Sequence, residues 1–207
     1  MKFISQLGII PFDFSVLASN LKNYKSPRQK ILELEKQGAI IRLKRGMYVV
    51  SPSVSGKPLS EELIANHLYG PSYVSMETAL RYYGLIPESV HVVVSMTLKL
   101  TKNYKNNVGR FEYIHCPADY YSIGIRQVVE EDYAYLIASP EKALCDLIAY
   151  TPKLRLRFVK SMQTYLEEDI RFDMVEFYKM NPDIFEQCSA VSKKKRDIQN
   201  ILKLLRK

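Results

Sequence analysis

The spacing of apolar residues predicts two consecutive helices near the start of the chain. In the segment 13–23, apolar side chains recur at helical spacing, at Phe14, Leu17, Ala18 and Leu21. A second helix is expected to begin at Ser26, whose hydroxyl would cap it, with Pro27 in its first turn. Gly38 is placed to end this helix. The short link between the two helices is typical of a helix-turn-helix.

A β-hairpin is expected directly after the second helix. Residues 39–43 and 47–50 are short apolar, β-branched runs, which predict strands. The basic turn 44–46 joins them, and its Gly46 permits a tight connection. The order helix, turn, helix and hairpin predicts a winged helix-turn-helix over residues 1–50.

The rest of the chain is expected to begin with a linker and two helices. Residues 51–59 are rich in Ser, Pro and Gly and lack periodicity, which indicates a linker. A helix then follows that Ser60 is expected to cap and Gly70 to end. The next helix has Ser75 as its expected cap and Gly84 as its expected end.

Runs of β-branched and aromatic residues predict the strands of the same region, at 89–96, 109–117, 120–129 and 133–139. The Asn and Gly residues in 100–109 are typical of a hairpin connection, so we expect mostly antiparallel pairing. Ser139 as cap and Pro140 in the first turn then predict another helix.

Helical patterns dominate from residue 152 onward. Segments 154–168 and 172–180 are two candidate helices, and the tail from Ser192 is a third, with an apolar stripe at Ile198, Ile201, Leu202 and Leu205. The expected fold class is therefore α+β: a winged helix-turn-helix over 1–50, the linker, and a mixed α/β domain over 60–207 with a helical C-terminal third.

Charge is unevenly distributed along the 207 residues, whose net charge is +8. Residues 1–58 hold ten Lys/Arg and three Asp/Glu, a net of +7, and residues 151–207 hold thirteen and eight, a net of +5. Residues 59–150 hold seven and eleven, a net of −4. Basic ends around an acidic middle favour a polyanionic partner.

Composition excludes several classes of protein. No apolar run approaches the ~20 residues that span a bilayer, and the N-terminal segment lacks the continuous apolar core of a signal peptide. We therefore expect no membrane association and a cytoplasmic location. Three widely spaced cysteines, Cys116, Cys145 and Cys188, fit neither a disulfide framework nor a metal site, and we expect reduced, buried thiols.

The winged helix-turn-helix would place its second helix in the major groove of double-stranded DNA. Side chains at the start of that helix lie where base edges or phosphates would be, and those of the hairpin could grip phosphate or reach the minor groove. The candidate DNA-binding residues are Lys25, Ser26, Arg28, Gln29, Lys30, Arg42, Lys44 and Arg45. Lys36 lies at the other end of the helix, and we expect it to face solvent without contacting DNA.

Two alternatives to DNA binding stay open. A basic helix and hairpin also occur in winged helices that contact an acidic protein, and a run of charge is often only a solvated helix face. The same choice applies to a candidate second basic patch near the C-terminus, at Lys193, Lys194, Lys195 and Arg196. A homodimer on an inverted repeat suits regulators of this kind, but no residue pattern decides it.

Three stretches carry a resemblance to a known family. "LKRGMYVV" (43–50), "GPSYVSMETALRYYGLIPE" (70–88) and "ASPEKALCDLI" (138–148), in this order, resemble the AbiEi-like antitoxins of type IV toxin–antitoxin systems. The likeness covers about residues 10 to 150, and the helical C-terminal third matches only loosely.

The resemblance implies a transcriptional repressor of its own operon that opposes a nucleotidyltransferase-like toxin without a lasting complex. By the same likeness, Lys44, Arg45 and Gly46 match the DNA-contacting turn, and two groups match the antitoxin domain: Ser75, Ala79 and Leu80, and Pro140, Ala143, Leu144 and Asp146. From the residues themselves we expect the latter to serve packing, with Asp146 fixing a loop or pairing with an arginine. A stand-alone winged-helix transcription factor or a protein-contact module without a toxin is the alternative.

An enzymatic function has little support. His115 and Cys116 are adjacent on a predicted strand and so point to opposite faces, and neither His67 nor His91 belongs to a recognisable catalytic motif. No glycine-rich phosphate loop is present. We therefore expect no catalytic residue, no metal and no cofactor.

Overall fold

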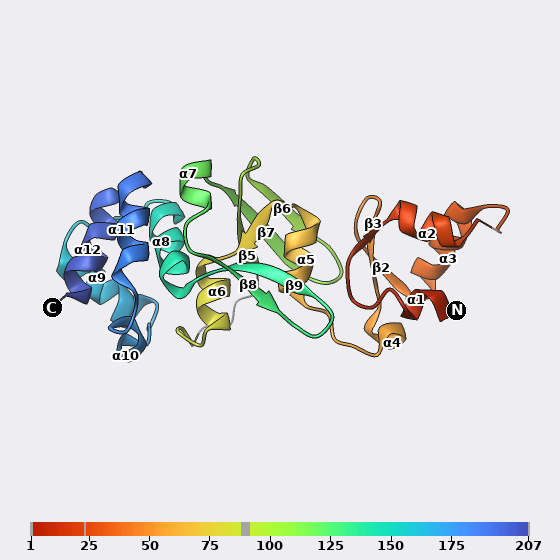
Figure 1. Cartoon of the computed structure of the whole chain (residues 1–207), viewed down its shortest axis with the longest axis horizontal. Coiled ribbons are helices and arrows are strands. Elements are labelled where there is room, and N and C mark those ends of the chain that lie inside the picture. The colour runs from red at the N-terminus through yellow and green to blue at the C-terminus, as the bar shows by residue number, and fades with distance from the viewer. Residues whose placement is uncertain (1, 23, 88–91, 207) are drawn as a thin grey trace.

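The chain is an α+β protein with three regions arranged in a row (Figure 1). The computed structural model describes residues 2–22, 24–87 and 92–206. A small N-terminal module lies at one end, a sheet with its helices lies in the middle, and a group of helices lies at the other end. The two termini are consequently at opposite ends of the long axis.

The N-terminal module contains three helices and a small sheet. Its elements are, in chain order, α1 (Lys2–Ser5), β1 (Phe12–Asp13), α2 (Phe14–Asn20), α3 (Pro27–Lys36), β2 (Ile40–Lys44) and β3 (Met47–Val50). The strand order is β1-β3-β2, with antiparallel pairing throughout. Leu17, Leu21, Ile31 and Leu34 are buried against Tyr48 and its neighbours, so the predicted apolar helix faces form this core.

The hairpin β2–β3 has a second buried face, which belongs to the main core of the protein. Leu43 and Val49 are almost completely buried there. The Lys44 ammonium donates a hydrogen bond to the Leu68 carbonyl oxygen at 2.6 Å, and the Asn106 amide donates one to the Leu43 carbonyl oxygen at 3.1 Å. The hairpin therefore joins the N-terminal module to the middle region.

The predicted linker is partly ordered by its own contacts. Residues Pro52–Ser55 form a one-turn helix, α4, because the Ser51 hydroxyl accepts a hydrogen bond from the Ser53 amide and Pro52 suits the first turn. Further along, Lys57 forms an ion pair with Asp132 in the loop after β8. The connection is thus attached to the middle region at its end.

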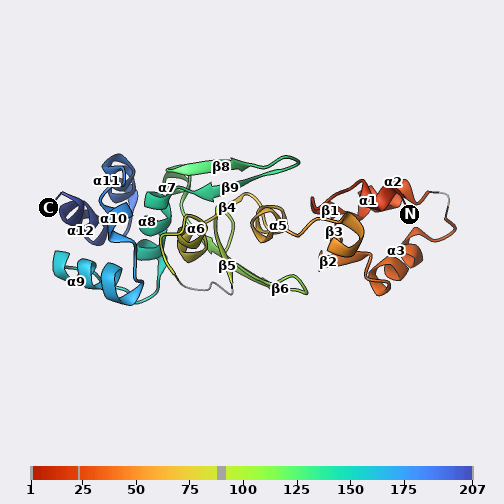
Figure 2. The same cartoon turned by 90° about the horizontal axis from the view of Figure 1, so that it is seen from below.

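The middle region is built on a six-stranded mixed sheet with the order β6-β7-β5-β4-β9-β8. The strands are β4 (Ser72–Val74), β5 (Val93–Thr97), β6 (Lys102–Lys105), β7 (Arg110–His115), β8 (Ile125–Val129) and β9 (Ala134–Ala138). Figure 2 shows the two edges, β6 and β8, on opposite sides of the helices α5 and α6.

Three features of this sheet differ from the prediction. The pairs β4–β5, β6–β7 and β8–β9 are antiparallel, in line with the expected mostly antiparallel pairing, but β5 and β7, which were expected to form a hairpin, are parallel, and so are β4 and β9. The segment expected as a plain hairpin connection contains the strand β6, which pairs with β7. Strand β4 was not predicted, because its three residues precede a helix and show no period of their own.

Helices α5 (Glu61–Leu68), α6 (Met76–Tyr82), α7 (Ala118–Tyr121) and α8 (Pro140–Tyr150) pack on or beside the sheet. The expected caps are present at α5 and α8: the Ser60 hydroxyl accepts a hydrogen bond from the Leu63 amide, and the Ser139 hydroxyl accepts one from the Lys142 amide. The prediction for Ser75 is wrong in its detail. Its hydroxyl makes no cap but donates to Asp146 at 2.6 Å.

Asp146 lies at the centre of a buried polar cluster. Its carboxylate accepts hydrogen bonds from the Ser75 and Tyr73 hydroxyls and pairs with the Lys142 ammonium at 3.0 Å. Lys142 also donates to the Tyr120 carbonyl oxygen. Lys142 and Asp146 are completely buried, so their ion pair is part of the protein core. Asp146 thus pairs with a lysine, whereas an arginine was one of the expected partners.

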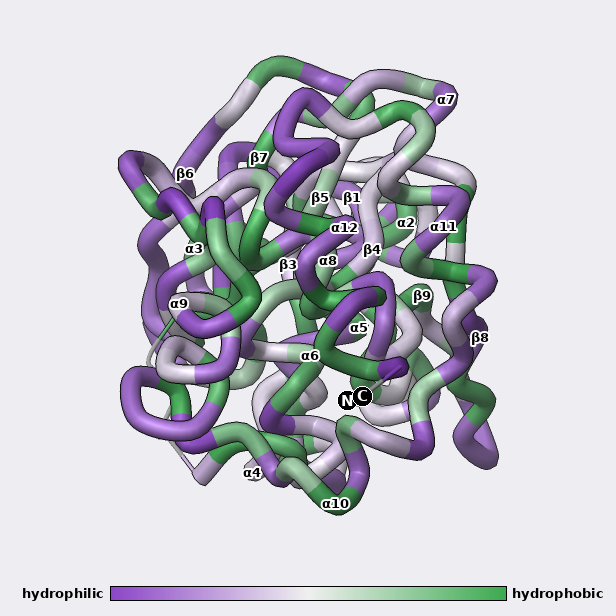
Figure 3. The backbone as a smooth tube through the Cα atoms, turned by 90° about the vertical axis from the view of Figure 1, so that its left-hand side faces the viewer, coloured by the Kyte–Doolittle hydropathy of each residue, from purple (hydrophilic) through white to green (hydrophobic). Residues whose placement is uncertain are grey.

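The helical end of the molecule contains α9 (Val159–Thr164), the π-helical turn η1 (Tyr165–Asp169), α10 (Met174–Phe177), α11 (Pro182–Val191) and α12 (Lys195–Leu205). Helix α11 was not predicted; it lies between the candidate helix at 172–180 and the tail from Ser192. The predicted stripe of α12 is confirmed, since Ile198, Ile201 and Leu202 are buried. Figure 3 looks along the long axis from this end and shows polar and apolar residues alternating along its helices. Within the described ranges, no helix has both the length and the apolar character to cross a membrane.

Candidate nucleic-acid interface

The first turn of α3 presents a group of exposed polar side chains. Lys25, Ser26, Arg28 and Gln29 are exposed, and the first turn contains no acidic residue. The expected cap is absent: Ser26 has the extended backbone of an N-cap, but its hydroxyl accepts no hydrogen bond from the helix. This hydroxyl and the first-turn N–H groups are therefore available to an external acceptor.

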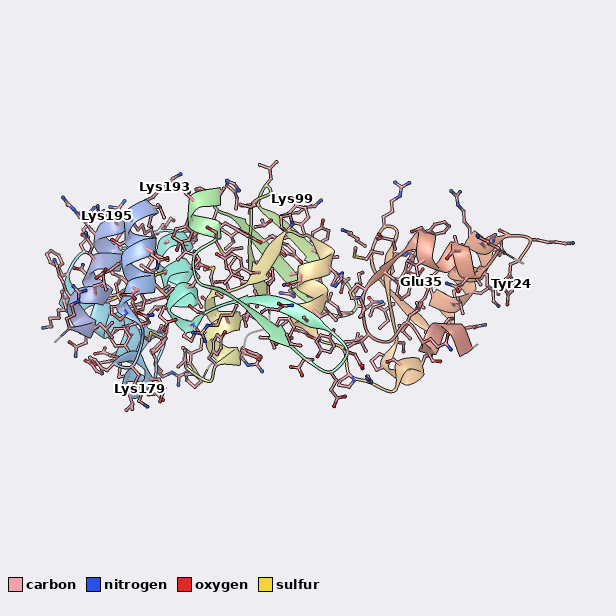
Figure 4. The ribbon with its side chains drawn as sticks, viewed as in Figure 1. Tyr24, Glu35, Lys99, Lys179, Lys193 and Lys195 are labelled. Carbon is pink, nitrogen blue, oxygen red and sulfur yellow. The ribbon has the colours of Figure 1, made fainter. Side chains whose placement is uncertain are left out.

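The electrostatics at this position favour an anion. The free N–H groups at a helix start carry a partial positive charge. Lys30 is largely neutralised within the helix, because its ammonium bonds to Glu33 at 2.8 Å and lies 5.8 Å from the centre of the Tyr24 ring. Lys25 and Arg28 have no such partner in the described part of the chain. Figure 4 labels Tyr24 at the outer end of the module, so this helix start lies at one tip of the molecule.

The turn of the β2–β3 hairpin presents one exposed cation. Arg45 is exposed and follows directly after β2. Gly46 has a φ of 78°, which residue types other than glycine rarely adopt, as expected for the tight turn. The Gly46 carbonyl oxygen accepts a hydrogen bond from the Phe14 amide at 2.8 Å, which fixes the turn against the start of α2. Arg45 is therefore an exposed side chain on a rigid base.

The other two predicted cations of the hairpin have partners inside the protein. The Arg42 guanidinium bonds to the Glu35 carboxylate at 2.5 Å and lies 5.8 Å from the centre of the Tyr48 ring. Lys44 is half-buried and holds the Leu68 carbonyl oxygen. Both side chains would have to release these contacts to reach DNA, so we assign them to the joint between helix, hairpin and sheet.

The candidate second basic patch also divides into two kinds of residue. Lys193, Lys195 and Arg196 are exposed, and Figure 4 shows Lys193 and Lys195 at the same edge of the helical end. Lys194 is different, because its ammonium donates to the carbonyl oxygens of Ile148, Thr151 and Leu154, each at 2.9 Å. Burial is the main cause that lowers the pKa of Lys194.

Sequence reasoning missed a cluster of lysines and tyrosines beside the hairpin. The ammonium groups of Lys99 and Lys102 lie 5.2 and 5.5 Å from the centre of the Tyr69 ring, and Lys102 lies 5.0 Å from that of Tyr104. Tyr69 directly follows Leu68, which holds Lys44. The available signal was the recurrence of lysine at every third residue, at Lys99, Lys102 and Lys105, just before and on the edge strand β6.

The residues considered for catalysis are not brought together. Cys116 lies just beyond β7 and is fully buried, and burial is the main cause that raises the pKa of its thiol to about 12. It is therefore protonated at neutral pH. His115 is exposed, with its Nδ1 3.1 Å from the Lys99 carbonyl oxygen. His67 lies on α5, where burial is the main cause that lowers its pKa, and His91 lies outside the described residues.

The described residues include no group of three or more His, Cys, Asp or Glu side chains able to hold a metal ion. The three cysteines are free and buried, far from one another in sequence. The geometry therefore concentrates its exposed chemistry in cations, at the α3 start, the hairpin turn and the helical end. No protein-family model matches the chain, and no curated protein matches it either.

Proposed function

We propose that this protein is a transcriptional regulator that binds double-stranded DNA through its N-terminal module. In this proposal the start of α3 enters the major groove, and Arg45 contacts the phosphate backbone or the minor groove. Arg28 and Gln29 are the side chains assigned to base edges, because arginine and glutamine offer paired contacts to guanine and adenine.

The observation that carries the proposal is the first turn of α3. Among the residues that the structure describes, it combines free backbone N–H groups, an unused Ser26 hydroxyl, two exposed cations without partners and no acid, at one tip of the molecule. A merely solvated helix start usually satisfies its orphan N–H groups with the capping side chain that it already carries. This one leaves its serine unused.

The order of elements in the N-terminal module supports the same proposal. It runs α1, β1, α2, α3, β2 and β3, with a two-residue turn between the last two strands, which is the order of a winged helix-turn-helix. In that reading α3 is the recognition helix and β2–β3 the wing.

An acidic protein is the main alternative partner, and a salt titration against DNA separates the two. Full-length protein should bind selected duplex fragments from genomic DNA with an affinity that falls steeply as salt increases, because each phosphate contact releases counterions. Binding to an acidic protein with no retained DNA fragment would contradict the proposal.

Arg28→Ala and Arg45→Ala test the docking face on the selected fragment. We expect Arg28→Ala to cost about 1–3 kcal/mol and to relax base preference at one position, since it would remove a base contact. Arg45→Ala should weaken binding to all sequences and lower the salt dependence. Lys36→Ala is the matched control, because Lys36 is exposed in the last turn of the same helix. Fluorescence anisotropy measures the DNA affinity of all three variants. Equal affinities for wild type, Arg28→Ala and Arg45→Ala would show that this face is not the DNA-binding surface.

The finer proposal, drawn from the resemblance, is that the DNA is the operator of the protein's own operon and that the protein opposes a nucleotidyltransferase-like toxin without a stable complex. The residues of the resemblance that lie in the middle region, Ser75 and Asp146 among them, pack in its core. Expression of a nucleotidyltransferase-like neighbouring gene alone should stop cell growth, and co-expression of this protein should restore it. If the chain does not restore growth, it is a stand-alone regulator.

A further inference from the structure

We propose that a cavity at the end of α8, together with the basic groove beside it, binds a nucleoside di- or triphosphate. The site lies at the helical end of the molecule, away from the proposed DNA-binding module, and does not depend on DNA binding.

The cavity is large enough for a nucleoside. It has a volume of about 410 Å³ and lies between the loop before α7, the end of α8 and the loop between α11 and α12. Its walls include the Tyr150 ring, Pro117 and Val191, with Asp119, Thr151 and Ser192 as polar groups. The Tyr150 ring is held against that of Tyr120, with 5.5 Å between ring centres. This apolar surface, with these polar groups and His115 beside it, suits a planar ring that carries hydrogen-bonding edges.

The groove next to this cavity is strongly basic. It has a volume of about 880 Å³, and six exposed cations line it: Lys153, Arg155, Arg157, Lys193, Lys195 and Arg196. In the described part of the chain, none of these side chains forms an ion pair or a hydrogen bond. Asp197 is the acid that lines the groove, and it is buried. Cations gathered without neutralising partners repel one another, so they favour a multiply charged anion.

Three lysines join the cavity to the groove, and two of them are exposed. Lys153 and Lys193 line both, as does Lys194. Lys153 has a backbone φ of 62°, which residues other than glycine rarely adopt. The Lys194 ammonium fixes this turn, because it holds the carbonyl oxygens of Thr151 and Leu154 on either side of Lys153. The chain thus places two exposed ammonium groups at the point where a ring would end and phosphates would begin.

This combination distinguishes a nucleotide from other anions. A DNA duplex presents phosphates to a groove but keeps its bases stacked, so it would leave the cavity empty. Inorganic phosphate would occupy the groove alone. A nucleoside di- or triphosphate fills both parts, with the ring beside Tyr150 and the phosphates among the cations.

Isothermal titration calorimetry on the full-length, DNA-free protein tests the proposal. The ligands are the four ribonucleoside triphosphates and inorganic triphosphate. We expect saturable binding of at least one nucleotide that is at least about tenfold tighter than that of inorganic triphosphate, because only the nucleotide engages the cavity. No saturable binding at millimolar nucleotide, or equal affinity for inorganic triphosphate, would overturn the proposal without any variant.

Three variants locate the site. Lys153→Gln with Lys193→Gln should weaken nucleotide binding at least about tenfold by removing charge-assisted hydrogen bonds. Val191→Trp should fill the cavity and weaken nucleotide but not inorganic triphosphate. Lys203→Gln is the matched control, since Lys203 is exposed on α12 and lines neither the cavity nor the groove. An equal loss with Lys203→Gln, or binding of single-stranded oligonucleotides but no mononucleotide, would also overturn the proposal.

Discussion

Lys44 and Arg45 are neighbours in one hairpin, yet their surroundings differ. Lys44 is half-buried with its ammonium on the Leu68 carbonyl oxygen, whereas Arg45 is exposed and has no such contact. The same contrast separates Lys194 from Lys193. At the scale of single residues, a basic run is therefore a mixture of cations that hold the protein together and cations that face a partner.

The Lys44→Ala variant measures this difference. It leaves the Leu68 carbonyl oxygen without its charged donor at the junction with the sheet, which should lower the free energy of unfolding by about 1–3 kcal/mol. Arg45→Ala should leave stability within about 0.5 kcal/mol of wild type, because the side chain is exposed. Urea denaturation followed by circular dichroism gives both values. The assignment of Lys44 to the joint fails if the two variants are equally stable.

Buried thiols and phenols predict a loss of stability in alkali. Burial raises the pKa of Cys116 from 9.0 to about 12, and mainly burial raises that of Tyr121 from 10.0 to about 12. The folded protein keeps these protons to higher pH than the unfolded chain does. The stabilisation is therefore complete below about pH 9 and is lost as pH rises toward 12, at up to about 1.4 kcal/mol per pH unit for each group.

The Cys116→Ala variant isolates the thiol's share of this loss. Urea denaturation of wild type and variant at pH 8, 9 and 10 should show a smaller decline in the variant, by about 1 kcal/mol between pH 9 and 10. The variant is expected to be less stable at every pH because it loses buried volume, so the slopes are compared. Parallel slopes would show that Cys116 does not titrate as its burial implies.

At the scale of elements, the sequence predicted those whose ends carry chemical signals. Helices α3, α5, α6 and α8 were expected, because a cap residue or a proline begins each and, in most cases, a glycine follows. Helix α11 is an exception, because it was missed although Asn181 caps it and Pro182 stands in its first turn, whereas the missed strands lack such signals. Strand β4 has three residues, and β6 (Lys102–Lys105) is polar and follows no period of two in hydrophobicity.

The parallel pairs within the sheet could not be predicted for a related reason. The parallel contact of β5 with β7 depends on β6 lying outside them at the edge of the sheet, and no local pattern specifies that order. In the candidate interface, too, only the features set by local sequence could be predicted. The exposed start of α3 could be predicted from local sequence, whereas the partners of Arg42 and Lys44 come from Glu35 on the preceding helix and from Leu68, 24 residues away.

At the scale of the whole molecule, the hairpin is the element that joins the N-terminal module to the middle region. One face of β2–β3 closes the core of the N-terminal module, where Tyr48 and Val50 are buried. The other face places Leu43 and Val49 in the main core. A docked hairpin keeps Arg45 at a fixed position relative to the rest of the chain, which suits recognition by a rigid surface.

The variant Leu43→Glu should uncouple the N-terminal module from the rest. Leu43 is 3% exposed, so a carboxylate there would be buried without a partner and should separate the two packed surfaces. We expect calorimetry to resolve two unfolding transitions where wild type shows one, because each part keeps its own core. Leu100→Glu is the matched control, since Leu100 is 81% exposed and should change neither the number of transitions nor their midpoints. A single transition at the wild-type temperature in Leu43→Glu would mean that the hairpin does not hold the module, and Arg45 would then have no fixed place from which to contact DNA.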